Sequence, residues 1–449
     1  MTHDIIIIGA GPGGYEAAAH AVAQGLRVLL IEKSHLGGTC LNQGCIPTKA
    51  FCRSAQVADD VAAAATFGVI LPQGDVSVDI RRVVERKDAI VEQLRESVAM
   101  LCEGADIVRA SARFLGPHEV EADGTIYSAP RIIVATGSQA ASLPIEGADL
   151  AVSASDLLSL EMLPESLAIV GGGVIGMEFA SVFASFGVEV TVIEYCKEIL
   201  PMFDRDVVRT LRSALKRRGV NFHTEAKVTD IRLGEGVRRI VRFERKGKPA
   251  QVDAEMVLMA VGRRPVIPEG LAECGVEISR RGIVVDNRFE TAVPGIFAIG
   301  DCNGICLLAH AASAQAAVVM GDNVDLSVVP SAVFTVPECA MVGSTEEQLQ
   351  AQGLEYKVAK STFRTNGKAL AMGEPEGVVK MITDPATGLI LGCQIVGPHA
   401  ADLIAEVALA ISSRLTAAAI LSTIHTHPSL SEALLPLSAP NHLSDYISQ

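Results

Sequence analysis

The chain has 449 residues, of which 49% are hydrophobic and 20% charged, and its formal net charge is −14 at pH 7. The length predicts about three domains with enough apolar surface for several cores. An acidic chain repels phosphate backbones, so no nucleic acid partner is expected. We also expect no membrane span and no signal peptide, and therefore a cytoplasmic location, because no long apolar run and no basic leader are present.

The first predicted elements form a strand–turn–helix–strand unit. Four isoleucines at 5–8 predict a strand, glycines at 9–14 a tight turn, 15–24 a helix, and the apolar run 28–31 a second strand that ends at Glu32. Continuous runs of Ile, Val and Leu are typical of strands buried on both faces of a parallel sheet. A glycine turn between strand and helix, with an acid after the next strand, indicates a dinucleotide-binding unit.

The segment 36–49 comes directly after this unit and contains two close cysteines, Cys40 and Cys45. In an ideal α-helix, Cα atoms five residues apart are separated by about 8–9 Å, whereas a disulfide needs less than about 7 Å. A bond between these cysteines therefore requires a distorted helix, and Gly44 supplies the conformational freedom. Such a disulfide is accessible and reducible, as a catalytic one must be; the alternative is two unconnected buried cysteines. Lys49, one turn further, favours a thiolate.

A second unit repeats the same plan further along the chain. A strand at 167–170, a glycine turn at 171–176, a helix at 177–186 and a strand at 188–193 lead to Glu194. An acid in this position accepts hydrogen bonds from ribose hydroxyls, and it repels a 2′-phosphate, which favours NAD over NADP. Two complete units predict two nucleotides, a flavin at one site and a nicotinamide at the other.

Three further apolar strands connect the units. Those at 131–136 and 255–262 mark the points where the chain crosses between domains, and the one at 291–300 returns to the first domain and ends at Asp301, which we expect to bind the flavin's ribityl or phosphate region. The predicted fold is α/β, with one Rossmann-like dinucleotide-binding domain inserted in another and a C-terminal α+β domain. The predicted boundaries are 1–143 for the first domain, 144–261 for the inserted domain, 262–327 for the return segment and 328–449 for the C-terminal domain.

The C-terminal part ends with two histidines close together. Strands are predicted at 333–335, 378–382 and 389–396, a turn at 384–388, and helices at 400–412 and 417–422. Beyond them, His425 and His427 are followed by Glu432. A histidine with a nearby acid forms a base-plus-orienter pair, and dithiol attack on a disulfide needs a proton acceptor near neutral pH. The residues alone do not decide which histidine is the base, nor whether Pro428 is cis.

The chain has ten cysteines in all. Those outside the close pair lie singly or in apolar contexts, which is typical of reduced packing residues. Cys302 and Cys306 lack a second Cys or His pair at zinc spacing, so no metal site is expected.

Together these residues resemble the flavin-dependent pyridine nucleotide–disulfide oxidoreductases, and within that family the branch that oxidises dihydrolipoamide. The resemblance runs essentially from end to end. It is carried by the segments 9–14, 38–49, 135–137, 171–178, 262–265, 300–301, 308–310, 334–338 and 427–428, together with Glu432.

The resemblance implies roles for individual residues. Cys40 exchanges with the substrate dithiol, and Cys45 lies nearer the flavin as the charge-transfer thiolate. His427 is the base and Glu432 its orienter, while Lys49 pairs with Glu178 beside the flavin. The expected FAD contacts are Gly9, Gly11, Gly14, Glu32, Thr39, Lys49, Thr136, Gly137, Asp301 and Ala309. The expected NAD contacts are Gly171, Gly173, Gly176, Glu194 and Gly262.

The resemblance also implies partners. The C-terminal domain forms the interface of a homodimer and sends His427 into the partner's site, so that electrons pass from dihydrolipoamide to the cysteine pair, to FAD and then to NAD. The dithiol is a small molecule, or it is carried by a lipoylated acyltransferase or lipoyl carrier protein; which multienzyme complex is served is left open.

Two alternatives are left open. One is an NAD(P)H-dependent reductase of another small disulfide, such as glutathione disulfide, and the other is a non-catalytic flavoprotein redox sensor or scaffold. Gln43 and Gln315 depart from the residues usual in the family, valine and glutamate, but neither position is catalytic. The tail 441–449 lacks the cysteines that mercuric reductases and large thioredoxin reductases need.

Overall fold

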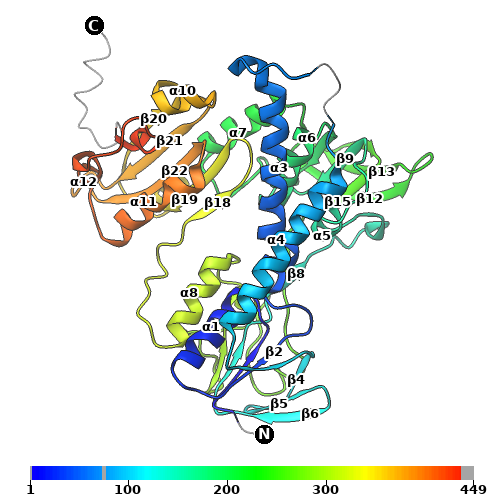
Figure 1. The fold of residues 1–449 in the computed structure, drawn as a ribbon, viewed down its shortest axis with the longest axis vertical. Coiled ribbons are helices and arrows are strands. Elements are labelled where there is room, and N and C mark those ends of the chain that lie inside the picture. Colours follow the sequence, from blue (N-terminus) through cyan, green and yellow to red (C-terminus); the bar gives the residue numbers. More distant parts are fainter. Residues whose placement is uncertain (1–2, 73–76, 436–449) are drawn as a thin grey trace.

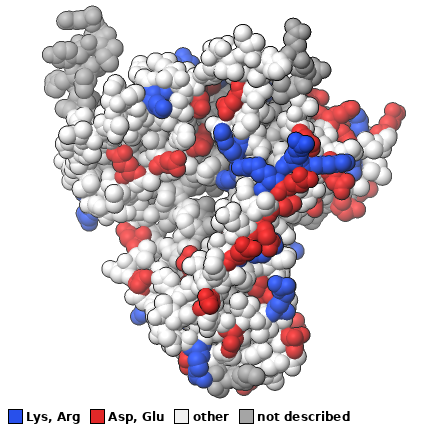
Figure 2. Space-filling model, viewed as in Figure 1, with Lys and Arg blue, Asp and Glu red and all other residues white. Residues whose placement is uncertain are grey.

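The computed structural model describes residues 3–72 and 77–435, so the tail 441–449 lies outside the described residues. Figure 1 shows three bodies: one around the N-terminus, one formed by the middle of the chain, and one by its C-terminal part. Figure 2 shows acidic side chains spread over all three bodies on that face, with a group of basic side chains over the upper parts of helices α3 and α4. Within the described residues, no helix is both long enough and apolar enough to cross a membrane.

The first body is built on a five-stranded parallel sheet with the strand order β17-β7-β1-β2-β3. Ile5 and Ile7 of β1 pack against helices α1 and α8 on one face, while Ile6 and Ile8 pack against Phe114 and its neighbours on the other. This is the two-faced burial that the isoleucine run predicts. The elements are β1 (Ile5–Ile8), α1 (Pro12–Ala23), β2 (Val28–Ile31), β3 (Asp106–Val108), β7 (Ile132–Val134), β17 (Ile296–Ala298) and α8 (Ala309–Val319), with an antiparallel sheet of β4 (Ala112–Gly116), β5 (Glu119–Ala122) and β6 (Thr125–Ser128).

The second body repeats this arrangement with a four-stranded parallel sheet in the order β11-β10-β9-β15. Leu167 and Ile169 of β9 face the core under helix α6, whereas Ala168 and Val170 face an antiparallel sheet. The elements are η2 (Ala148–Leu150), α5 (Ala154–Leu157), β9 (Ser166–Val170), α6 (Val174–Ser185), β10 (Glu189–Ile193), α7 (Arg205–Arg217), β11 (Asn221–His223), β12 (Ala226–Leu233), β13 (Arg239–Arg245), β14 (Lys248–Ala254) and β15 (Met256–Met259).

The chain enters and leaves the second body through two strands that lie side by side. Strand β8 (Ser138–Ala140) pairs antiparallel with β16 (Arg263–Pro265). These strands come directly after the two predicted crossover strands, so the second unit is inserted between them. The exact domain limits stay a prediction.

Helix α3 (Cys45–Ala63) extends from the first body to the second, beside α4 (Ile80–Leu101) (Figure 1). It is preceded by α2 (Gly38–Gln43) and followed by the short helix η1 (Ala64–Phe67). Polar contacts join α3 to the second body at two places. Lys49 pairs with Glu178 at 2.9 Å, and further along the helix Asp59 pairs with Arg218 at 2.6 Å.

The C-terminal body is a five-stranded antiparallel sheet in the order β18-β19-β22-β21-β20, with helix α11 packed on β19 and β22. Its elements are β18 (Ser331–Val333), β19 (Glu338–Gly343), α9 (Glu346–Ala351), β20 (Lys357–Thr362), η4 (Phe363–Thr365), α10 (Gly367–Met372), β21 (Val378–Thr383), β22 (Ile390–Gly397), α11 (Ala400–Ser412), α12 (Ala417–Ser422) and η5 (Ser431–Leu434). Both predicted helices are confirmed. The sequence prediction missed β19 and β20 and placed the first strand two residues late, at 333–335.

Candidate active site

One cavity of about 2440 Å³ extends between the three bodies. This is larger than the roughly 300–1,000 Å³ typical of a single small-molecule site, and it leaves room for two dinucleotides. Most of the predicted site residues line it, namely Gly9, Gly11, Glu32, Thr39, Cys40, Cys45, Lys49, Thr136, Gly137, Gly171, Gly173, Glu178, Glu194, Gly262, Asp301 and Ala309. Gly14, Gly176, His427 and Glu432 are not among the lining residues.

The first and third glycines of each turn are required by close backbone packing. A Cβ atom on Gly14 would lie 1.8 Å from the carbonyl oxygen of Gly9, and one on Gly176 would lie 2.0 Å from that of Gly171. The first glycines, Gly9 and Gly171, have φ of +102° and +111° and are equally confined. Gly14 and Gly176 therefore serve the packing of helix on turn, which explains why they do not line the cavity.

The second glycines have the opposite environment. A Cβ atom on Gly11 or Gly173 would meet nothing within 4 Å, although both residues line the cavity. Each also precedes the first residue of its helix, α1 or α6, where free N–H groups favour a negative charge. This is the space that a pyrophosphate needs to approach the backbone, so both turns fit a dinucleotide.

Glu32 and Glu194, the acids that come after the second strands of the two units, are held by the same kind of backbone contact. Glu32 accepts hydrogen bonds from the backbone N–H groups of Ala10, at 2.7 Å, and Ser34, at 2.8 Å. Glu194 accepts from those of Gly172 and Cys196, both at 2.5 Å. Each carboxylate is thereby turned towards its glycine turn, and it keeps lone pairs for a ribose hydroxyl.

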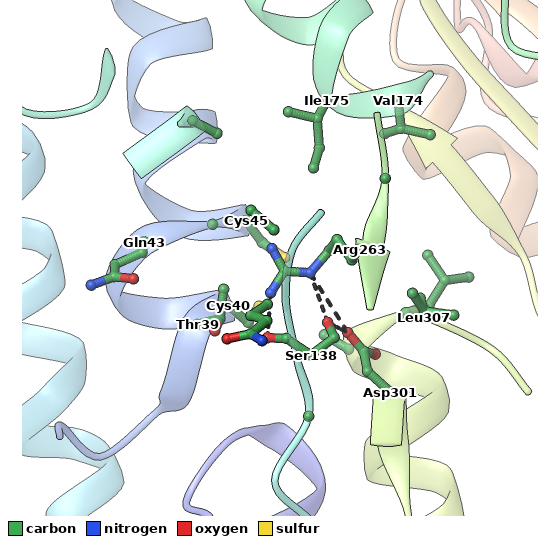
Figure 3. Close-up of a pocket in the computed structure, with 18 of the residues that line it drawn as sticks. Thr39, Cys40, Gln43, Cys45, Ser138, Val174, Ile175, Arg263, Asp301 and Leu307 are labelled. Atoms are coloured by element: carbon green, nitrogen blue, oxygen red, sulfur yellow. Dashed lines mark hydrogen bonds and ion pairs between the residues drawn. The ribbon is translucent and has the colours of Figure 1, made fainter. Parts of the chain in front are cut away.

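Asp301 belongs to a network that sequence reasoning missed. Ser138 Oγ donates to Asp301 Oδ2 at 2.5 Å, while Arg263 Nε donates to Ser138 Oγ at 2.7 Å and Arg263 Nη2 to the Ser138 carbonyl at 2.6 Å. Figure 3 shows these three side chains beside the cysteines. The available signal was position, because Ser138 and Arg263 each come directly after a predicted site glycine where the chain crosses between domains.

Gln315, one of the departures from the family pattern, supports the same region. Its side chain is buried, and its Oε1 accepts from the Gly300 backbone N–H at 2.8 Å and from Asn303 Nδ2 at 2.9 Å. A glutamine oxygen can accept both bonds without a buried charge. The turn that carries Asp301 is therefore held without the usual glutamate.

The redox segment has the helix break that its spacing demands. Helix α2 ends at Gln43 and α3 begins at Cys45, with Gly44 between them at φ −136° and ψ −111°. Cys40 and Cys45 face each other across the break (Figure 3). The disulfide between them stays a prediction.

Asn42, between the cysteines, ties the segment together and was not singled out from the sequence. Its Nδ2 donates to the carbonyl oxygens of Leu36 and Gly38, and its Oδ1 accepts from Arg95 of α4 at 2.8 Å. Both sides of the amide are thus satisfied. The short helix α2, which carries Cys40, is thereby fixed to the long helix α4.

The electrostatics of the pair place the negative charge on Cys45. The hydrogen bond between the two thiols lowers the pKa of Cys45 and raises that of Cys40, and the Lys49 ammonium lowers the pKa of Cys45 further. Cys45 is also the first residue of the 19-residue helix α3, where the helix dipole favours an anion. These surroundings favour a thiolate at Cys45 over one at Cys40.

Lys49 is held in place by a buried carboxylate. Its Nζ donates to both oxygens of Glu178, at 2.9 and 3.0 Å, and lies 4.5 Å from the centre of the Phe334 ring. Glu178 Oε1 also accepts from the Phe334 backbone N–H. Burial alone would lower the pKa of Lys49, but the Glu178 carboxylate outweighs it and the pKa is raised. Lys49 is therefore a stable cation beside Cys45.

His427 and Glu432 lie together on the surface of the C-terminal body. His427 Nδ1 contacts Glu432 Oε1 at 2.8 Å, and its side chain is 80% exposed. The Ser429 backbone N–H donates to the other Glu432 oxygen at 2.7 Å; this bond, and then the contact with His427, hold the pKa of Glu432 below its ordinary value. The His427–Pro428 peptide is cis. The ring is thus oriented by a carboxylate and projects away from its own chain.

The chain belongs to the pyridine nucleotide–disulphide oxidoreductase family. Residues 3–316 match that family, and residues 329–437 match its dimerisation domain, which implies a homodimer. That family consists of FAD-dependent disulfide oxidoreductases that use NAD or NADP. In the described part of the chain, no group of three or more His, Cys, Asp or Glu side chains could hold a metal ion.

Among individual relatives, the chain is 38% identical to a dihydrolipoyl dehydrogenase of Thermus scotoductus and 39% identical to one of Chlamydia muridarum, with 98% of each chain covered in both cases. Among solved structures, it is similar to the HOCl-induced flavoprotein disulfide reductase RclA from Escherichia coli. There the TM-score is 0.86 at 30% identity, over 97% of this chain and 99% of that one.

Proposed function

We propose that this chain oxidises dihydrolipoamide to lipoamide, with Cys40 and Cys45 as its redox disulfide and NAD as the final acceptor. The observation that carries the proposal is the sulfur pair at a helix break, in the same cavity as both nucleotide turns. The full-length similarity to two dihydrolipoyl dehydrogenases supports dihydrolipoamide as the dithiol.

The chemistry begins with the oxidised cysteine pair. One substrate thiol gives its proton to His427 of the partner subunit, which releases it to solvent, and the resulting thiolate attacks Cys40 Sγ. The Cys40–Cys45 bond breaks, and Cys45 leaves with the electron pair as a thiolate. That product is the one favoured by Lys49 and by the start of α3. Cys40 is now joined to the substrate in a mixed disulfide.

The second substrate thiol then attacks the substrate sulfur of the mixed disulfide. The cyclic disulfide of lipoamide forms, and Cys40 leaves and takes up a proton. His427 of the partner subunit accepts the proton from the attacking thiol and returns it to Cys40, while Glu432 orients the imidazole and stabilises its charged form. Bound FAD and NAD supply the carriers that take the two electrons from the reduced cysteine pair to nicotinamide.

The Lys and Arg side chains that line the cavity are Lys33, Lys49, Lys227 and Arg263, and those engaged within the chain support an uncharged substrate over glutathione disulfide. Two of its cations are already engaged, Lys49 by Glu178 and Arg263 by Ser138. Glutathione disulfide carries several carboxylates that need cationic partners, whereas lipoamide has none. At the nucleotide end, Glu194 opposes a 2′-phosphate, which supports NAD as the acceptor.

Steady-state assays test the proposal directly. The FAD-loaded chain is expected to turn over dihydrolipoamide with NAD far faster than NADPH with glutathione disulfide. A preference for the second pair of substrates would contradict the choice of dithiol. Binding of FAD without any dithiol turnover would instead favour a redox sensor or scaffold.

Cysteine and histidine variants test the mechanism within that assay. Cys45→Ser is expected to abolish turnover and the long-wavelength absorption of the reduced protein, and His427→Gln to slow dithiol oxidation by about 100-fold or more while FAD stays bound. Cys52→Ser is the matched control, because Cys52 lies on the same helix α3 but hydrogen-bonds only to the Phe334 carbonyl. Near-normal activity of Cys45→Ser or of His427→Gln would contradict the mechanism.

A further inference from the structure

A second histidine lies buried next to the segment that carries His427. His425 has a side chain only 5% exposed, whereas Ile424 before it is 98% exposed and the His427 side chain after it is 80% exposed. The chain therefore turns one imidazole into its own domain and the next one outward. The buried His425 is therefore placed to anchor the segment, and the exposed His427 is placed to react.

Both ring nitrogens of His425 face oxygen acceptors. Nδ1 lies 2.9 Å from the Thr423 carbonyl oxygen, and Nε2 lies 3.0 Å from Glu406 Oε1 of helix α11. A neutral imidazole has one N–H and can make only one of these bonds, whereas an imidazolium makes both. The geometry therefore favours a positively charged His425.

The charged groups around His425 agree with this assignment. Glu406 faces it from α11 and Glu432 from η5, while the neighbouring helix α12 contains no charged residue. Burial alone would lower the pKa of His425, but the hydrogen bond to Glu406 and then that to Thr423 raise it. The imidazolium is thus bonded to the Glu406 carboxylate, and the charge of Glu432 adds to the shift.

Helix α11 is itself firmly placed. Its buried residues include Ile404 and Val407, and Glu338 of β19 accepts from the Ala401 backbone N–H at its first turn. A bond from His425 to Glu406 therefore ties the segment before His427 to the core of the C-terminal body. Among residues 3–72 and 77–435, Glu432 is the one side chain that bonds the exposed His427 ring.

We propose that His425, as an imidazolium bonded to Thr423 and Glu406, is a positioning residue that aims the His427–Glu432 pair at the partner's cysteines. This proposal rests on the proposed function, in which His427 is the base. It adds a residue that touches neither substrate nor cofactor. His425 acts only through the orientation of the segment from 425 to 432.

The proposal predicts a particular pH dependence. A histidine whose pKa is raised in the folded chain contributes its contact fully below the ordinary pKa, and the contact is lost as the pH rises through the raised one. In the wild type, kcat should therefore fall on the alkaline side as His425 loses its proton. Glu406→Gln removes the group that raises this pKa, so the alkaline fall should move to lower pH.

The test uses the full FAD-loaded chain and four variants: Glu406→Gln, His425→Gln, the double variant and Asp402→Asn. Asp402 is the matched control, because it pairs with His399 on the same helix α11 but on the surface. The kcat is measured across pH for either dihydrolipoamide oxidation by NAD or glutathione disulfide reduction by NADPH, whichever the wild type catalyses. Reduction of ferricyanide by NADH, which bypasses the cysteine pair, reports intact folding and bound FAD.

We expect each single variant to lose about 10-fold in kcat and the double variant to lose no more than either, because the two residues form one contact. Ferricyanide reduction and the Asp402→Asn variant should stay at the wild-type level. The proposal would be overturned if the losses in kcat multiplied in the double variant. It would also be overturned if the alkaline fall in kcat stayed at the same pH in Glu406→Gln. If His425→Gln fails to fold, the pH profile of Glu406→Gln decides. If the wild type does not oxidise dihydrolipoamide, only the proposed function is contradicted. The pH profile of kcat is then measured on glutathione disulfide reduction, so the role of His425 is still tested.

Discussion

The two dinucleotide-binding units have nearly the same backbone plan but lead to different chemistry. In each, the second glycine faces open space and a carboxylate is bonded to two backbone N–H groups beside the turn. The units differ in the segment that comes after the carboxylate: Glu32 leads into the helix break that carries the cysteines, whereas Glu194 leads into a short loop with an exposed Tyr195. The two glycine turns therefore offer a phosphate the same space, and the units differ in the segment that comes after the second strand.

The largest effect should come from filling the third glycine of either unit. The added methyl group of Gly14→Ala or Gly176→Ala meets a carbonyl oxygen at 1.8 or 2.0 Å, and backbone cannot give way cheaply. We expect Gly14→Ala to lose bound FAD, seen as loss of flavin absorbance. Gly176→Ala should keep FAD and raise KM for NAD by about 10- to 100-fold, which corresponds to about 1–3 kcal/mol of overpacking. Loss of FAD in both variants would mean that the two turns do not act separately.

The next effect concerns the acid of the second unit. Glu194→Gln removes the negative charge that opposes a 2′-phosphate while keeping the side-chain size. We expect the preference for NAD over NADP, measured as the ratio of kcat/KM values, to fall by about 10-fold. Glu189→Gln, at the exposed start of the same strand, is the control and should leave the ratio unchanged. An unaltered ratio in Glu194→Gln would show that the nucleotide preference is set elsewhere.

Lys49 belongs to the segment that comes after the first unit, and the second unit has no counterpart to it. Because the Lys49 ammonium lowers the pKa of Cys45, Lys49→Met should raise that pKa by about 1 unit. The thiolate exists above this pKa and is lost as the pH falls through it. In a titration of the reduced protein, the long-wavelength absorption should therefore appear at higher pH in the variant. If the titration curve of Lys49→Met equalled that of the wild type, the low pKa of Cys45 would come from Cys40 and the start of α3 alone.

The smallest effect should come from the far end of α3. Asp59→Asn weakens the partly buried ion pair with Arg218, and we expect a loss of about 1 kcal/mol in the free energy of unfolding, measured with denaturant. Asp60→Asn is the control, because Asp60 is 62% exposed and lies 3.8 Å from Arg53. Equal losses in both variants would mean that this contact does not join α3 to the second body.

The sequence predicted the parts of this protein whose signals are local. The run of isoleucines at 5–8, the two glycine turns and the helix 400–412 depend on neighbouring residues, and each is found where it was expected. Strand β20 was missed because half of it is exposed and carries Lys, Ser and Thr, so no apolar alternation marks it. Strand β19 was also missed, and its hydrogen bonds come from β18 and β22, the latter far along the chain.

The same distinction applies to the site. The spacing of Cys40 and Cys45 required a helix break, and Gly44 provides it. The contacts of Ser138 with Arg263 and of His425 with Glu406 join residues from different elements, so they become visible only once the chain is folded.

Helix α3 has a consequence for how this protein could be re-engineered. It begins at Cys45 in the first body, yet Glu178 and Arg218 of the second body support it at two points along its length. The inserted unit is therefore part of the scaffold that supports helix α3 and, with it, Cys45. Exchanging it for a foreign nucleotide-binding module would leave α3 without its supporting surface, so a chimera of this kind must carry both contacts with it.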